Sequence, residues 1–141
     1  MSLNNQSISG TCLCGNVNIK INPPSNIFDA CHCGMCRKWA SGPIFTVEGG
    51  DQPQISGNEF ISVYNSSEWA ERGFCKQCGT HLFYRIKNTD FCNFSAGLFK
   101  EVEKFKFQVQ IFVDSKPDCY EFANKTEMMT EAEVIAKFSQ K

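Results

Sequence analysis

The stretch CKQCG, residues 75–79, is a C-x-x-C turn followed by glycine, the pattern of a zinc knuckle. Such a turn lets backbone N–H groups point at the thiolates, and glycine tolerates the backbone geometry that the turn demands. The stretch CLCG, residues 12–15, carries the same trailing glycine with one residue fewer between the thiolates. The two half-sites together predict one closed, structural zinc site that joins two hairpins. Its ligands are Cys12, Cys14, Cys75 and Cys78.

A second cluster, CHCGMC at residues 31–36, supplies three thiols with no fourth cysteine nearby in the sequence. Three protein ligands and an open fourth position are typical of a catalytic zinc. His32 is the nearest candidate for the fourth ligand, but in an extended chain its side chain points away from those of Cys31 and Cys33. We therefore predict a catalytic zinc on Cys31, Cys33 and Cys36, with His32 packing against the site or supporting its ligands.

Several other residues could take part in this chemistry. Arg37 and Lys38 directly follow the second cluster and could hold the carboxylates of an anionic ligand, or they could be solvated surface charges. His81 could complete the triplet from a distance, although a polar residue on a strand is the simpler interpretation. Cys92 and Cys119 stand alone in the sequence, and we expect free thiols at both positions.

The nine cysteines also indicate a compartment. The N-terminus has neither a basic region nor an apolar one of the kind found in secretory signals. A reducing, cytoplasmic location is therefore expected, where metal binding or catalysis explains the thiols better than disulfides do. A redox switch, in which triplet thiols form a disulfide and release the metal, would add to catalysis and would not replace it.

The overall composition limits the class of protein. A length of 141 residues predicts one compact domain over residues 10–141, preceded by a flexible N-terminus over residues 1–9. A formal net charge of −1 and a pI near 6.1 argue against a nucleic-acid partner. No apolar run approaches the roughly 20 residues of a membrane span, so no membrane partner is expected. The sequence makes no prediction of the oligomeric state.

Short strands dominate the predicted secondary structure. Aromatic and β-branched residues gather at 17–21, 43–47, 60–64, 81–86 and 91–97. The longest alternation, over residues 104–113, predicts a half-buried strand. Its apolar face carries Phe105, Phe107, Val109, Ile111 and Val113, with Lys and Gln side chains on the opposite face.

One helix is predicted, close to the C-terminus. Thr130 can act as its N-cap, and Glu133 can complete a capping box. The apolar stripe of this helix is expected from Val134, Ile135 and Phe138. The sequence thus predicts a mainly β domain with a short C-terminal helix.

Three motifs in this order carry a family resemblance: C-x-C-G, then C-H-C-x-x-C-R-K, then R-G-F-C-x-x-C-G-T-x-L. They resemble those of the glutathione-dependent formaldehyde-activating enzyme family, which also includes centromere protein V. The segment 111–122, IFVDSKPDCYEF, is similar to the C-terminal segment of that family. The resemblance implies a β-tent fold of small antiparallel sheets, related to zinc ribbons. It also implies two zinc ions per chain, a structural one on the four-cysteine set and a catalytic one on the triplet.

The resemblance further implies an activity. The founding reaction condenses formaldehyde with glutathione to S-hydroxymethylglutathione and is classed as a carbon–sulfur lyase reaction. A small thiol such as glutathione and an aldehyde are thus the expected substrates, with Arg37 and Lys38 as candidate partners of the thiol's carboxylates. His32, His81 and Glu48 are weak candidates for a general acid or base.

Two positions depart from the family pattern. Similar proteins usually place His where this chain has Gln110, and they often have Trp where it has Cys119. The family thus predicts a lyase acting on a thiol adduct and does not fix the substrate. The alternative is a non-catalytic, zinc-stabilised binding module. A protein side chain in the fourth position of the triplet would favour that alternative.

Overall fold

The computed structural model describes residues 6–139, and its chain divides into two compact units. The first unit comprises the chain up to Asn26 together with Thr46–Phe105, and the second comprises Ile27–Phe45 and the chain from Lys106 onward. The single domain expected over residues 10–141 stays a prediction. Strand β1 begins at Ile8, inside the segment 1–9 that was expected to be flexible, and residues 1–5 lie outside the described residues.

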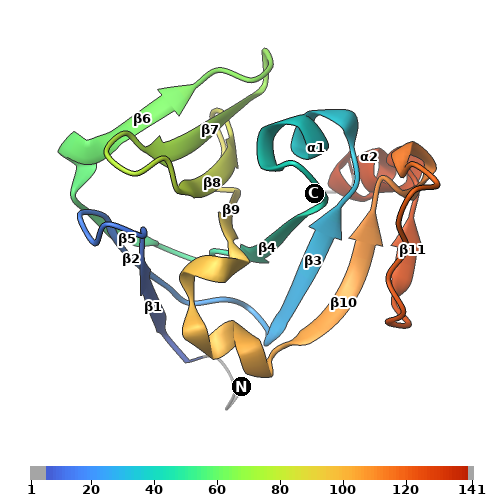
Figure 1. Ribbon diagram of the computed structural model, residues 1–141, viewed down its shortest axis with the longest axis horizontal. Helices are drawn as coiled ribbons and strands as arrows, with labels where there is room; N and C mark the ends of the chain where they lie inside the picture. Colours follow the sequence, from blue (N-terminus) through green and yellow to red (C-terminus); the bar gives the residue numbers. More distant parts are fainter. Residues whose placement is uncertain (1–5, 140–141) are drawn as a thin grey trace. The chain divides into compact units, whose positions relative to one another are not determined.

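The first unit contains two antiparallel sheets (Figure 1). One sheet has three strands in the order β1, β2, β5, which span Ile8–Thr11, Asn18–Ile21 and Gln54–Ser56. The other contains β6 (Ile61–Tyr64), β7 (Ala70–Cys75), β8 (His81–Ile86) and β9 (Cys92–Ser95), each paired with the next. Residues 46–48 of β4 (Ile44–Glu48) pair with β9.

Apolar side chains from both sheets of the first unit are buried, and short 3₁₀ turns connect its strands. The largest of these side chains, exposed by no more than 2 %, are Ile19, Ile21, Val47, Leu82, Phe94 and Phe99. The 3₁₀ turns are η1 (Asn58–Phe60), η2 (Ala96–Leu98) and η3 (Lys100–Lys104). Among these large buried side chains, those on strands lie on β2, β4, β8 and β9, which correspond to four of the five strands predicted from aromatic and β-branched residues. The fifth, at 60–64, forms β6 but stays outside the core, since Val63 and Tyr64 are exposed.

The second unit is built on a parallel arrangement (Figure 1). Strand β10 (Lys106–Ile111) lies between β3 (Ile27–Cys31) and β11 (Glu127–Met129) and runs parallel to both. Helix α1 (Gly34–Ala40) follows β3, a 3₁₀ turn η4 (Val113–Ser115) follows β10, and helix α2 (Glu131–Ser139) follows β11. The mainly β fold with small sheets and a short C-terminal helix is confirmed. The expectation that all the sheets are antiparallel holds in the first unit and is wrong in the second.

The long alternation of residues 104–113 is interrupted in the structure. The register of β10 against β3 shifts between Phe107 and Val109, so strict alternation ends at this bulge. Val109 and Gln110 are consequently both buried, at 7 % and 2 % exposure. The prediction that Gln110 lies on a solvated polar face is therefore wrong, because an irregularity of pairing cannot be read from the order of polar and apolar residues.

The N-terminus of helix α2 agrees with the prediction, but its predicted apolar stripe is only partly buried. The Glu133 N–H donates to Thr130 Oγ1 at 3.3 Å, and the Thr130 N–H donates to Glu133 Oε1 at 2.8 Å, which is the expected capping box. Val134 is buried, but Ile135 and Phe138 are 55 % and 38 % exposed. No helix within residues 6–139 is long and apolar enough to cross a membrane.

Candidate metal centres

The four predicted structural ligands meet in the first unit. The Sγ atoms of these cysteines lie within 4.8 Å of one another, and they come from the turn between β1 and β2 and the turn between β7 and β8. The two trailing glycines adopt the left-handed conformation that the knuckle requires, with φ of +83° at Gly15 and +80° at Gly79. Their N–H groups close the turns onto the Cys12 and Cys75 carbonyls at 3.0 and 2.7 Å.

Hydrogen bonds to the sulfurs of Cys12 and Cys78 favour thiolates at these two positions. The Val17 N–H donates to Cys12 Sγ at 3.3 Å, as expected for an N–H group pointing at a metal ligand. The Thr80 hydroxyl lies 3.1 Å from Cys78 Sγ and, with the Thr80 N–H, lowers the pKa of Cys78 to about 5. Thr80 Oγ1 also accepts from the Leu13 N–H at 3.1 Å, so it joins the two turns. Four convergent sulfurs, one of them easily ionised, fit a closed four-coordinate metal site consistent with zinc.

The second cluster lies in the second unit and comes from one short segment. Cys31 ends β3, Cys33 is the N-cap of α1, and Cys36 lies in the first turn of that helix. Their Sγ atoms lie within 4.8 Å of one another. The Cys36 N–H donates to Cys33 Sγ at 3.3 Å, so Cys33 caps the helix and presents its sulfur to the cluster.

Helix α1 was not predicted from the sequence, and it explains how the triplet forms. It is only seven residues long, Cys33 is not a typical N-cap residue, and Cys36 is its only buried residue. Neither a capping motif nor an apolar stripe therefore marks it in the sequence. The helical turn brings Cys36 back to Cys33, which an extended chain could not do.

The thiols of the triplet oppose one another's ionisation. The Cys33 and Cys36 side chains, together with burial, raise the pKa of the Cys31 thiol well above its usual range. Three thiols this close cannot ionise together unless a positive charge compensates them. A divalent metal ion supplies this charge, and thiolate ligands of this kind suit zinc. The donor set therefore fits the metal that the sequence predicts.

His32 is not a member of the triplet, in agreement with the prediction. Its side chain is fully buried, with Nδ1 at 2.7 Å from Tyr120 Oη and Nε2 at 2.8 Å from Gln110 Oε1. Burial lowers the pKa of His32, and the charges of Lys116 and Arg37 lower it further, while the bond to Gln110 partly opposes them. The partners Gln110 and Tyr120 were not predicted, and the only sequence signal at Gln110 was its departure from the family pattern.

The remaining candidates are placed as follows. Arg37 Nε donates to the His32 carbonyl at 2.9 Å, and Lys38 is exposed on α1. His81 on β8 and Glu48 on β4 belong to the first unit, and within residues 6–139 neither joins a group of potential metal ligands.

The two isolated cysteines also lie outside both clusters. Burial raises the pKa of Cys92 to about 12, which makes its thiol inert. Cys119 is exposed. Within residues 6–139 neither thiol joins a group of potential metal ligands, in agreement with the prediction of free thiols.

An aromatic cluster packs beside His32 in the second unit. The Phe28 and Phe107 rings stack at 5.2 Å, and Phe122 contacts Phe107 edge-on at the same centroid distance. Phe122 also lies 5.8 Å from the His32 ring, measured between centroids. Aromatic packing therefore continues from β3 and β10 through Phe122 to the imidazole of His32.

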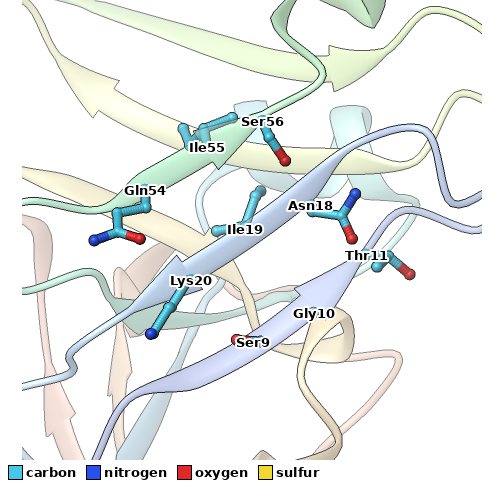
Figure 2. A pocket seen from close by; sticks show the side chains of 9 residues that line it. All are labelled: Ser9, Gly10, Thr11, Asn18, Ile19, Lys20, Gln54, Ile55 and Ser56. Atoms are coloured by element: carbon cyan, nitrogen blue, oxygen red, sulfur yellow. The ribbon is translucent and has the colours of Figure 1, made fainter.

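The first unit also has a surface hollow of about 360 Å³ on the three-stranded sheet (Figure 2). Its lining is mostly polar, with Ser9, Thr11, Asn18, Lys20, Gln54 and Ser56 on the exposed face. None of its nine lining residues is a cysteine, a histidine or an acid. No residue of either cysteine cluster lines this hollow.

A mainly β fold with a four-thiol and a three-thiol cluster defines a class of small proteins with two candidate metal centres. The profile of one family, described as glutathione-dependent formaldehyde-activating enzyme, matches residues 7–115. An uncharacterized lyase of Schizosaccharomyces pombe is 43% identical over 129 residues, which cover 89% of this chain and 93% of that protein. The chain therefore belongs to the glutathione-dependent formaldehyde-activating enzyme family.

One more distant relative agrees with this assignment, and one solved structure shares the fold. A Halomonas elongata protein, provisionally named glutathione-dependent formaldehyde-activating enzyme, is 24% identical over 84% of this chain and 82% of its own length. The crystal structure of a Rhodobacter sphaeroides protein matches with a TM-score of 0.56 and 19% identity, covering 66% of this chain and 88% of that one. The structural match supports the fold alone.

Proposed function

We propose that this protein is a zinc-dependent carbon–sulfur lyase that forms and cleaves the adduct of a small thiol with an aldehyde. The family membership and the lyase name of the fission-yeast relative support the class of enzyme. The observation that carries the proposal is the triplet. Three thiols converge on one point, and within residues 6–139 no fourth His, Cys, Asp or Glu joins them, so one coordination position is left for substrate.

The proposed reaction joins glutathione and formaldehyde. The thiol sulfur bonds to the carbonyl carbon, the carbonyl oxygen becomes a hydroxyl, and the thiol proton ends on that oxygen. The reverse reaction breaks the same carbon–sulfur bond, and neither direction oxidises or reduces a substrate. A zinc ion held by Cys31, Cys33 and Cys36 would supply a Lewis acid that keeps the substrate sulfur as a thiolate.

Arg37 and Lys38 are the proposed partners of the glutathione carboxylates. Because Arg37 Nε is bonded to the His32 carbonyl, the guanidinium is fixed beside the triplet and its terminal nitrogens are left for a carboxylate. Lys38 is exposed and supplies a second positive charge one residue further along α1. A cytoplasmic location, which we also propose, would provide the reduced thiols that both the site and its substrate require.

The test is the rate at which glutathione and ¹³C-formaldehyde exchange with their adduct, measured by NMR with the zinc-loaded protein. The proposal predicts acceleration over the spontaneous exchange, and loss of the acceleration in Arg37→Gln at low glutathione but not at saturating glutathione. Lys125→Gln, which removes a positive charge at an exposed position of the same unit, is the matched control. No acceleration by the fully loaded protein would reject the proposal and favour the binding module.

A further inference from the structure

We propose that Gln110 and Tyr120 act as a clamp that holds the His32 imidazole on the face of β3 opposite to the thiols, and thereby position Cys31 and Cys33 around the metal. This inference deepens the proposed function, because it assigns positioning residues to the same site. The pair Gln110 and Tyr120 is called the His32 clamp below.

The register of the sheet places the clamp. Gln110 of β10 pairs with Ala30 of β3, and Ile111 pairs with Cys31. Since side chains alternate along a strand, Ala30 and Gln110 share one face and Cys31 points to the other. The His32 ring bonds to Gln110 and therefore lies on the face of Ala30. The His32 side chain, which lies between Cys31 and Cys33 in the sequence, is thus directed away from both of these proposed ligands.

The hydrogen bonds fix the tautomer of His32. The amide of Gln110 donates from Nε2 to Thr126 Oγ1 at 2.9 Å, and the Thr126 hydroxyl donates to Met128 Sδ at 3.6 Å. Gln110 Oε1 therefore faces His32 and can only accept, so His32 Nε2 carries the proton. His32 Nδ1 then accepts from the Tyr120 hydroxyl at 2.7 Å. Both ring nitrogens are occupied, and neither has a lone pair for the metal.

Tyr120 is itself held in place. Lys116 Nζ donates to the Tyr120 carbonyl at 2.5 Å and to the Pro117 carbonyl at 3.0 Å. The Tyr120 ring stacks against His32, with 5.5 Å between the centroids. The loop that carries Tyr120 is therefore tied down by its main chain, and the hydroxyl approaches His32 from a fixed direction.

The main chain of His32 is anchored as well. Its N–H donates to the Ile111 carbonyl at 3.0 Å, and its carbonyl accepts from Arg37 Nε at 2.9 Å. With the two ring bonds, four hydrogen bonds hold the single residue that separates Cys31 from Cys33. Removal of groups that hydrogen-bond to metal ligands and orient them typically lowers metal affinity by about 10- to 100-fold, and the His32 clamp acts on the residue between two such ligands.

The experiment measures metal binding and needs no turnover. The full-length protein is titrated with Co²⁺ against a competing chelator, and the absorption of the cobalt–thiolate bands reports each cluster, with Cys33→Ser used to assign the bands of the triplet. Tyr120→Phe keeps the stacked ring and removes the hydroxyl, and Gln110→Met keeps the volume and removes the acceptor. Tyr64→Phe and Gln108→Met are the matched controls, because they make the same chemical changes outside the His32 clamp.

We expect each clamp variant to weaken Co²⁺ binding at the triplet by about 10- to 100-fold and to leave the four-thiol cluster unchanged. Changed triplet bands after addition of glutathione to the wild-type Co²⁺ protein, and a weaker change in both clamp variants, would further support the inference. Triplet affinity within about 3-fold of wild type in both variants would overturn it, and so would an equal loss at both clusters, the mark of general unfolding. Failure of the lyase proposal would appear separately, as absent turnover in the wild-type protein.

Discussion

The two cysteine clusters use similar sequence motifs for different structural ends. The cluster in the first unit joins two turns whose thiols are 61 residues apart, as between Cys14 and Cys75, and it gathers four ligands. The triplet in the second unit comes from six consecutive residues and gathers three. A cluster that joins distant segments closes a long loop and acts on folding, whereas a local cluster changes little in the fold and is available for chemistry.

The largest expected effect comes from breaking the closed cluster. Cys75→Ser removes one ligand of a site whose metal would contribute on the order of 10 kcal/mol to folding. We expect this variant to lose its cooperative thermal transition, because the β1–β2 and β7–β8 turns are no longer joined. Circular dichroism and calorimetry of the purified protein measure this thermal transition. A variant that melts like the wild type would show that the four thiols do not hold the first unit together.

The matched change in the triplet should affect activity instead. Cys33→Ser removes a ligand, but serine is a good N-cap, so α1 keeps its cap and the stability loss should stay below about 1 kcal/mol. Acceleration of the glutathione–formaldehyde exchange should disappear. Cys119→Ser, at an exposed cysteine outside both clusters, should keep full activity. Full activity in Cys33→Ser would rule out the catalytic role of the triplet.

The smallest expected effect is a difference in stability between the alanine variants of two glycines, one from each cluster. Gly79 has a φ of +80° with no atom within 4 Å of an added Cβ, so Gly79→Ala should cost about 1 kcal/mol through backbone strain alone. Gly34 starts α1 without a positive φ, and its Cβ would meet only the end of Arg37 at 3.7 Å. Gly34→Ala should therefore be neutral or slightly stabilising. Urea unfolding of the zinc-loaded variants measures the free energy of unfolding in each case. Equal losses of stability in the two variants would contradict the difference in turn geometry.

The sequence predicted what local patterns determine. The trailing glycines marked the knuckle turns, the alternation of an extended chain separated His32 from the triplet, and Thr130 with Glu133 marked the start of α2. Each of these inferences needs only a few neighbouring residues. The division of the cysteines into a distant set and a local set followed from spacing and was strengthened by the family resemblance.

What the sequence did not predict depends on pairing between distant segments. The bulge in β10 buries Gln110, and the loop after η4 brings Tyr120 to His32. Neither contact has a periodic signal, because each joins residues 78 or more positions apart. Helix α1 escaped detection for another reason, since seven residues with a cysteine N-cap carry too little propensity to identify it.

The measurement that tests the difference between the clusters most directly is zinc per chain by elemental analysis, before and after mild chelation. One closed and one open site predict two zinc ions per chain, of which chelation removes only the one at the triplet. Zinc content should then fall to one per chain while the fold is retained. Two zinc ions that resist chelation equally, or one ion that chelation does not touch, would contradict an open metal site in the second unit.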